Sequence, residues 1–284
     1  MDKVVPILVT GGSGYLGIHV RRFFGADDFS RRSSLNILDP IDLHQVQNYD
    51  VVIHLAAHLD KNPDSAEQCF RTNSEGTANV ISRMRRDSVF IYASTKDVYG
   101  AHAAVYDETP ETCPVDYAGQ TALEWSKLIG ERYVDYYAKE RGVRACIFRL
   151  SAVYARPSDG NESGFVTHYV ESVKHSWPIN VPVGGSAVRD ILHVDDFSRA
   201  CKAFIDSTRR VGLYNLGGGK TNAGSLREII ETVGRLIKLE PIIRENEVLR
   251  HPIPVNYISD LTKIRSELDW QPQIGIDEGL RSLL

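Results

Sequence analysis

The chain has 284 residues, of which 42% are hydrophobic and 25% are charged, and its formal net charge at pH 7 is −4. These are the values of an ordinary globular protein of one large or two small domains, and they exclude a disordered or fibrous chain. The charge gives no basis for binding nucleic acid or a membrane surface, and no stretch approaches the roughly eighteen apolar residues of a transmembrane helix.

The first half of the chain alternates short β-branched runs with longer helical stretches. Residues 7–9 form an apolar run without polar alternation, which is typical of a strand buried on both faces of a parallel sheet. This order predicts an α/β fold with a Rossmann-type doubly wound parallel sheet. We expect further strands at 50–55, 89–92 and 143–150, a short apolar run at 35–38, and helices at 15–24, 65–84 and 121–141.

The composition changes after Leu150, where Gly and Pro residues separate short elements and a helix is expected at 226–236. We therefore predict a dinucleotide-binding domain at 1–150, to which the chain returns near 190–216. Residues 151–284 are predicted to form a smaller α+β substrate-binding domain. The sequence contains no internal repeat, no low-complexity tract and no segment resembling a flexible linker.

A glycine-rich loop, TGGSGYLG at 10–17, lies between the first predicted strand and the first predicted helix. Gly11, Gly14 and Gly17 allow a tight turn, close approach of backbone N–H groups to a pyrophosphate, and close packing of the helix on the strand. The pattern predicts dinucleotide binding; the alternative is a glycine turn without a ligand. The other predicted cofactor contacts in this loop are Ser13, Tyr15 and Leu16.

The choice between NAD and NADP depends on the residues that follow the second strand. An Asp or Glu about twenty residues after the glycine loop is typical of NAD binding. Here a short strand around 29–30 is followed by Arg31 and Arg32, whose guanidinium groups suit a 2′-phosphate, so NADP is slightly favoured. The alternatives are two solvated arginines, or a register in which Asp39 binds the ribose.

Six further motifs follow the glycine loop in a specific order. They are HLAA at 54–57, NSEGT at 73–77, STKDVYG at 94–100, SKLIGE at 126–131, RDILHVDD at 189–196 and YNLGGG at 214–219. Together with the loop, they resemble the extended short-chain dehydrogenase/reductase family of nucleotide-sugar enzymes over nearly the whole chain. The resemblance implies an NAD(P)-dependent oxidoreductase acting at C4 of a nucleotide-diphosphate sugar, either an epimerase or a 4-keto-sugar reductase.

The resemblance also implies roles for individual residues. Family members use a Tyr and a Lys one helical turn apart, with a Ser or Thr bonded to the same sugar oxygen. Lys127 and Thr95 match the last two, and Thr95 is also expected to bind substrate. Arg189 and Arg250 match positions that grip the nucleoside diphosphate. The residues implied to line the cofactor are Asn36, Ile37, Leu55, Ala56 and Ala57.

The expected catalytic tyrosine is missing from its usual position. Four residues before Lys127 the chain has Leu123, and the nearest candidate, Tyr117, lies ten residues before Lys127. On a continuous helix this offset spans about 15 Å, so Tyr117 can act only from a loop that folds back. Either Tyr117 supplies the acid/base in this way, or the chain is a degenerate member that binds dinucleotide or nucleotide-sugar with little catalysis.

Two further departures concern the substrate. Thr95-Lys96-Asp97 stands where dehydratases of the family carry Thr-Asp-Glu, which argues against 4,6-dehydration because a lysine cannot replace the carboxylic acid. Ala152 stands where the family has an Asn that contacts the nucleotide-sugar. Arg189 and Arg250 disfavour a dehydrogenase of steroids or flavonoids.

The helix expected at 121–141 has apolar surface on more than one face, which exceeds the single stripe that one buried contact needs. Family members often pair this helix and the one before it in a four-helix dimer interface, so we expect a homodimer. The apolar residues in question are Leu123, Leu128, Tyr133, Tyr136 and Tyr137.

The cysteines and histidines form no recognisable ligand set. Cys69, Cys113, Cys146 and Cys201 are scattered without a CxxC pair, which favours free thiols in a reducing compartment. No metal site is expected, because the nine histidines lack ligand spacing. The N-terminal residues lack the pattern of a signal peptide, so a cytoplasmic location is predicted.

Overall fold

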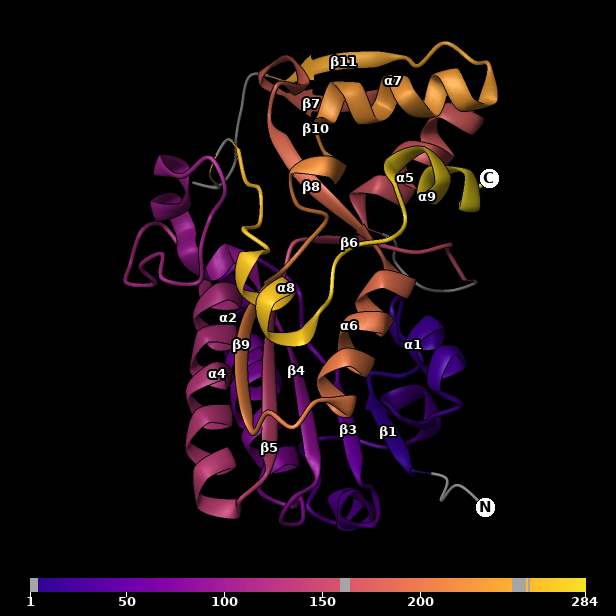
Figure 1. The fold of residues 1–284 in the computed structure, drawn as a ribbon. Coiled ribbons are helices and arrows are strands. Elements are labelled where there is room, and N and C mark those ends of the chain that lie inside the picture. Colours follow the sequence, from indigo (N-terminus) through magenta and orange to yellow (C-terminus); the bar gives the residue numbers. More distant parts are fainter. Residues whose placement is uncertain (1–4, 159–163, 247–253, 255) are drawn as a thin grey trace.

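The large sheet has six parallel strands in the order β2-β1-β3-β4-β5-β9. Its strands are β1 (Ile7–Thr10), β2 (Asp27–Phe29), β3 (Val51–His54), β4 (Val89–Thr95), β5 (Arg144–Leu150) and β9 (Val211–Leu216). Figure 1 shows this computed structural model, which describes residues 5–158, 164–246, 254 and 256–284. The order confirms the predicted doubly wound sheet, and it reverses direction between β1 and β3, where such sheets bind ligands.

Helices cover both faces of the sheet (Figure 1). One face packs against α1 (Gly17–Phe24), α6 (Val194–Asp206) and α8 (Thr262–Leu268). The other packs against α3 (Gly76–Ile81) and α4 (Ala122–Arg141), which ends at Gly142 in the left-handed region with φ 67°. The helix predicted at 65–84 is continuous from Ala66 to Ile81, and it consists of α2 (Ala66–Cys69), a π-helical segment (Phe70–Glu75) and α3.

The second half of the chain builds a smaller unit with its own core. A three-stranded sheet contains β10 (Ala223–Ser225), β8 (Val188–His193) and β6 (Ala152–Tyr154), and a two-stranded sheet contains β11 (Ile243–Asn246) and β7 (Ile179–Pro182). Its helices are α5 (Phe165–Lys174), α7 (Leu226–Ile237) and α9 (Ile276–Ser282). Because β9 pairs with β5, part of this half lies in the large sheet. The division at residue 150 stays a prediction.

The second strand differs from its predicted position, which was around 29–30. It ends at Phe29, whose carbonyl accepts from Gly11 N at 2.9 Å, and Ser30 then caps a 3-10 turn. The apolar run at 35–38 also makes no strand. Asp42 accepts from Asn36 N at 2.7 Å and the Asn36 side chain accepts from Leu38 N at 3.0 Å, so local side-chain hydrogen bonds hold this segment in a turn.

No helix within the described ranges is long and apolar enough to cross a membrane. All four cysteines are buried and free of disulfides. Within the same ranges, no group of three or more His, Cys, Asp or Glu side chains is arranged to hold a metal ion.

Candidate active site

The glycine loop makes a tight turn between β1 and α1. Gly14 N donates to Gly11 O at 2.9 Å, and Gly11 has φ +70°, a conformation that L side chains rarely adopt. A Cβ on Gly11 would lie 2.8 Å from Ala56 N, and one on Gly17 would lie 2.2 Å from Gly11 O. Both glycines are therefore required by packing within the protein, whatever ligand binds.

Gly14 has a different environment, which bears on whether a dinucleotide fits. A Cβ there would have one atom within 4 Å, Gly11 O at 3.1 Å, apart from its chain neighbours. The side of the loop that Gly14 presents is therefore open, and it lies next to the N-terminus of α1, which begins at Gly17 after the cap residue Leu16. Backbone N–H groups at such a terminus favour an anion, so the pyrophosphate of a dinucleotide fits this loop.

The other side chains of the loop are held by neighbouring elements. Ser13 donates a hydrogen bond to Asp28, and Arg32 donates to Ser13 O at 3.2 Å. The Tyr15 hydroxyl donates to Ala155 O at 2.9 Å and accepts from Ala155 N at 2.8 Å, which ties the loop to the second half of the chain. Burial raises the pKa of Tyr15, so its hydroxyl stays neutral.

The segment after β3 lies against the glycine loop. Ala56 N donates to Thr10 Oγ1 at 3.3 Å, and half-buried Leu55 and Ala57 flank Ala56. The side chain of Asn73 fixes the continuation of this segment by bonding both backbone groups of His58, at 2.8 and 2.9 Å. The HLAA and NSEGT motifs are therefore parts of one structural unit.

Asn36 and Ile37, which were also predicted to line the cofactor, have different roles. Ile37 is buried, and its side chain would meet a Cβ on Gly76 at 2.5 Å, so it packs against α3. Asn36 is exposed and holds the turn described above. The Asp39 side chain accepts from Ile41 N at 2.8 Å within the following turn. Arg31 is exposed on the 3-10 turn after β2.

Thr95 lies at the carboxyl end of β4, and Lys127 contacts the same strand two residues earlier. Thr95 is the last residue of β4 and caps the turn after it by accepting from Asp97 N at 3.2 Å. Lys127 projects from α4 and donates from Nζ to Ala93 O at 2.7 Å. Burial lowers the pKa of Lys127 to about 8, with the Glu131 carboxylate opposing the shift. A lysine of this kind gains or loses its proton near neutral pH.

The tyrosine predicted to complete this pair lies elsewhere. Tyr117 sits in the loop before α4 with 70% of its surface exposed, and it makes no hydrogen bond to the described residues. Gln120 holds that loop by accepting from Ala118 N at 2.6 Å and donating to Val98 O at 2.9 Å. Leu123, one turn before Lys127, is buried with 7% exposure.

An ionic network that sequence reasoning did not find lies beside Thr95. Lys96 pairs with Asp97, and Lys61 pairs with Asp97 at 3.1 Å and with Glu124 at 2.7 Å. Burial opposes the shift, but the ammonium groups of Lys96 and Lys61 hold the pKa of Asp97 well below its usual range. Lys61 follows the HLAA motif closely, and Glu124 is in the first turn of α4. These two positions are the only features of the sequence that could have indicated the network.

Arg189 approaches this network from β8. Burial lowers its pKa, while the negative charges of Asp97 and Asp190 oppose the shift. Its Nη1 donates to Val188 O at 2.6 Å. Asp190 itself is fully buried and accepts from Gly219 N and Ser259 N, both at 3.1 Å, so it holds the backbone. Arg250 lies outside the described residues.

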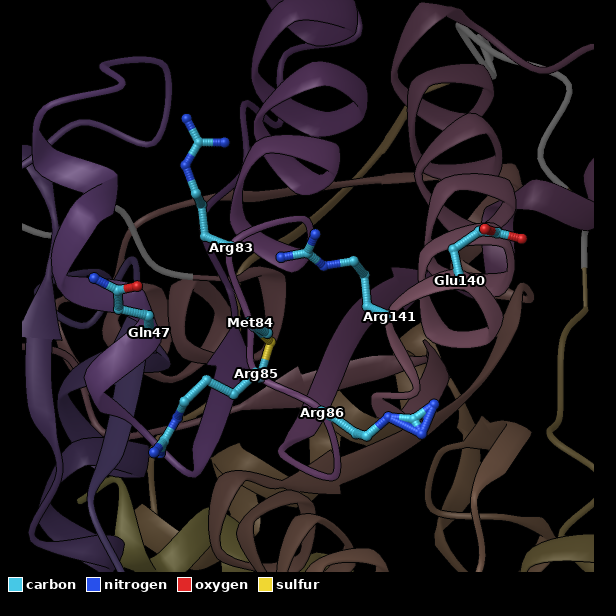
Figure 2. A pocket seen from close by; sticks show the side chains of 7 residues that line it. All are labelled: Gln47, Arg83, Met84, Arg85, Arg86, Glu140 and Arg141. Atoms are coloured by element: carbon cyan, nitrogen blue, oxygen red, sulfur yellow. The ribbon is translucent and has the colours of Figure 1, made fainter.

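A cavity of about 370 Å³ lies at the opposite edge of the large sheet. Figure 2 shows arginines around it from the turn before β4 and from the last turn of α4. These segments lead into the amino ends of β4 and β5, whereas the glycine loop and Thr95 are at carboxyl ends. The cavity is therefore separate from the candidate active site. Its lining residues are Gln47, Arg83, Met84, Arg85, Arg86, Glu140 and Arg141.

Comparison with known proteins gives matches over nearly the whole chain. The sequence profile described as "NAD dependent epimerase/dehydratase family" matches residues 7–217. A CDP-paratose 2-epimerase from Salmonella typhi is 24% identical over 98% of this chain and 98% of its own length. A dTDP-glucose 4,6-dehydratase from Mycobacterium tuberculosis is 28% identical over 98% of this chain and 92% of its own.

A solved structure also shares the fold. It is the UDP-glucuronic acid 4-epimerase from Bacillus cereus in complex with UDP-glucuronic acid and NAD. The TM-score is 0.82 at 20% identity, and the match covers 98% of this chain and 97% of the other.

Proposed function

The chain belongs to the NAD dependent epimerase/dehydratase family, and on this premise we propose that it oxidises or reduces C4 of a nucleoside-diphosphate sugar, as an epimerase or as a 4-keto-sugar reductase. The observation that carries the proposal is that an open glycine loop, Thr95 and the buried amine of Lys127 all lie toward the carboxyl edge of one parallel sheet. Such an edge is where open α/β sheets bind their ligands.

The residues of this site suit the roles that the family resemblance implies. A bound nicotinamide would supply the hydride chemistry. Lys127 would bind the ribose beside it and, as a cation, would favour ionisation of a nearby acid/base. Thr95 would hydrogen-bond the sugar hydroxyl that loses its proton, and Arg189 would bind the diphosphate through its guanidinium fork. Tyr117 is the proposed acid/base, because it is the first tyrosine before Lys127 in the chain and lies in the loop that leads into α4.

The cofactor that the comparisons favour is NAD. The family is described as NAD dependent, and the Bacillus cereus 4-epimerase contains NAD. The sequence-based preference for NADP rests on Arg31 and Arg32, and nothing in the comparisons supports it. The affinities of the chain for NAD and for NADP test that preference.

Two incubations test the proposed activity: NAD with a panel of UDP-, dTDP- and CDP-sugars, and NADH with the 4-keto forms of these sugars. The sugar is followed by NMR, and reduced cofactor by absorbance near 340 nm. Conversion at C4 of at least one sugar, by inversion or by reduction of its 4-keto form, is expected. Loss of water from a 4,6-dehydration would contradict the proposal, because Lys96 occupies the position of the carboxylic acid that dehydratases carry.

A second candidate function is binding without turnover. It is favoured by Leu123 at the expected tyrosine position. It is also favoured by Tyr117, which lies ten residues from Lys127 in the sequence and is exposed. Such a protein would bind dinucleotide and nucleotide-sugar with measurable affinity in calorimetry while leaving every sugar of the panel unchanged. That pair of results would replace the enzymatic proposal.

We also propose that the chain is a homodimer. Tyr136 on α4 is 58% exposed, and Tyr133 on the same helix is 36% exposed. The helix already buries Val134 and Ala138 against the large sheet, so these tyrosines lie outside the buried stripe. A second copy of the same helix face would cover them.

A further inference from the structure

Asp28 lies beneath the glycine loop in the middle of β2. Its side chain is 12% exposed. Ser13, in the loop, donates a hydrogen bond to Asp28 Oδ2, and Ser30, directly after β2, donates to the same oxygen at 3.0 Å. One carboxylate oxygen therefore accepts hydrogen bonds from two serine hydroxyls, one in the glycine loop and one directly after β2.

This arrangement fixes which hydrogen bonds the two serines can offer a ligand. A serine hydroxyl has one proton to donate and two lone pairs to accept with. Because both protons point to Asp28, Ser13 and Ser30 offer only lone pairs to their other side. Ser33 does not change this, since its hydroxyl donates to Ser30 O at 2.8 Å.

The position of these hydroxyls relates them to the adenosine ribose. Dinucleotide folds place this ribose beside the glycine loop at the end of the second strand, where an acidic side chain accepts a hydrogen bond from the 2′-hydroxyl. In this chain Ser30 follows the strand, and the acidic residue lies two positions earlier. The ribose would therefore meet Ser30 and Ser13 first, with the Asp28 carboxylate behind them.

We propose that Asp28 makes this chain select NAD over NADP, by holding Ser13 and Ser30 as hydrogen-bond acceptors and by placing a negative charge behind them. The inference rests on the proposed binding of a dinucleotide. The 2′-hydroxyl of NAD has a proton to donate to such acceptors. The 2′-phosphate of NADP has only acceptor oxygens at neutral pH, so it cannot donate a hydrogen bond to the two serines. Its negative charge is also repelled by the Asp28 carboxylate.

The charges around Asp28 leave its carboxylate only partly compensated. Arg21, on α1, approaches Oδ2 at 3.8 Å, which is too long for a hydrogen bond. Asp28 Oδ1 is buried and has no hydrogen-bond partner within the described part of the chain. Arg32 is drawn to the loop backbone at Ser13 O. Arg31 and Arg32 remain the groups that would attract a 2′-phosphate. Tighter binding of NADP would indicate that these arginines set the cofactor preference, and tighter binding of NAD would indicate that Asp28 does.

Calorimetric titration of the full chain with NAD and with NADP tests the inference. The wild type is expected to bind NAD at least about tenfold more tightly, the range of one or two hydrogen bonds to a charged or polar group. Asp28→Asn keeps the shape and removes the negative charge that opposes a 2′-phosphate, so the ratio of the two affinities should fall by about tenfold. Asp27→Asn, the neighbour in the same strand whose carboxylate accepts from Tyr49 at 2.9 Å, should leave the ratio unchanged.

Ser30→Ala supplies a second variant should Asp28→Asn fail to fold. It should weaken NAD several-fold, by the loss of one acceptor, without weakening NADP. Equal or tighter binding of NADP by the wild type, or equal effects of Ser30→Ala on both cofactors, would overturn the inference and leave the proposed function intact. Binding of neither cofactor would overturn the proposed function itself, and the inference with it.

Discussion

The Lys127 ammonium donates a 2.7 Å hydrogen bond to the carbonyl of Ala93, two residues before the end of β4. A helix of the outer layer is thereby tied to the central strand that ends at Thr95. The same bond keeps the amine in a buried position, where its charged form is costly. Lys127 is thus both a structural tie and a cation whose pKa is lowered to about 8 by burial.

The first prediction concerns stability against pH. Lys127 has a pKa of about 8 in the folded chain against an ordinary value of 10.5, so between these values the unfolded chain holds more protons. Stability therefore rises with pH across this window, and the cost of the buried charge is fully present below pH 8. Relative to Lys127→Met, the wild type should gain up to about 3 kcal/mol between pH 7 and pH 10.

Urea unfolding of both proteins at several pH values measures this difference. The comparison removes other groups that titrate in the same range, because they are common to both chains. Parallel curves would show that the Lys127 pKa is not lowered.

The second prediction separates cofactor binding from folding in the glycine loop. Gly14→Val adds a branched side chain on the open face of the loop, where the pyrophosphate is expected, and its Cβ meets only Gly11 O closely. We expect this variant to stay folded and to lose most of its affinity for NAD in calorimetry. Gly17→Ala is the matched control, because its Cβ would lie 2.2 Å from Gly11 O and should lower the melting temperature instead. Undiminished NAD affinity in folded Gly14→Val would place the dinucleotide elsewhere.

Local patterns in the sequence were sufficient for the sheet and the glycine loop, because buried parallel strands and a glycine turn depend on residues that are adjacent in the chain. The ionic network of Lys61, Asp97 and Glu124 could not be predicted in this way. Its members come from three elements, and only the folded loop after β3 brings Lys61 to the other two.

The region around the second strand shows the same limit. From the sequence, Arg31 and Arg32 were predicted to bind a 2′-phosphate, because they are charged residues directly after a short strand. Asp28 was not singled out, because its significance depends on the parallel register of β2 and β1, which brings it under the glycine loop. Its contacts with Ser13 and Ser30 follow from that register.

The third prediction concerns assembly. If α4 forms the surface between two copies, Tyr136→Glu should place a charge in that surface and produce a monomer, while the wild type has the mass of two chains in light scattering at micromolar concentration. Trp177→Glu is the control, because Trp177 is 54% exposed but lies in the second half of the chain, after α5. A monomeric wild type would refute the dimer.

The last prediction concerns the acid/base, where the chain departs most from its family. If Tyr117 transfers the proton, Tyr117→Phe should slow turnover of the accepted sugar by about a hundredfold to ten-thousandfold. Thr95→Ala should cost less, because it removes one hydrogen bond. Since Tyr117 would act on the sugar and not on the dinucleotide, the loss should appear in kcat rather than in NAD affinity. Leu123→Tyr restores a phenol one helical turn before Lys127, and Leu123→Phe adds the ring alone. Two results together would contradict the role of Tyr117: turnover unchanged in Tyr117→Phe, and turnover higher in Leu123→Tyr than in Leu123→Phe. They would show that the missing acid/base belongs at the position of Leu123.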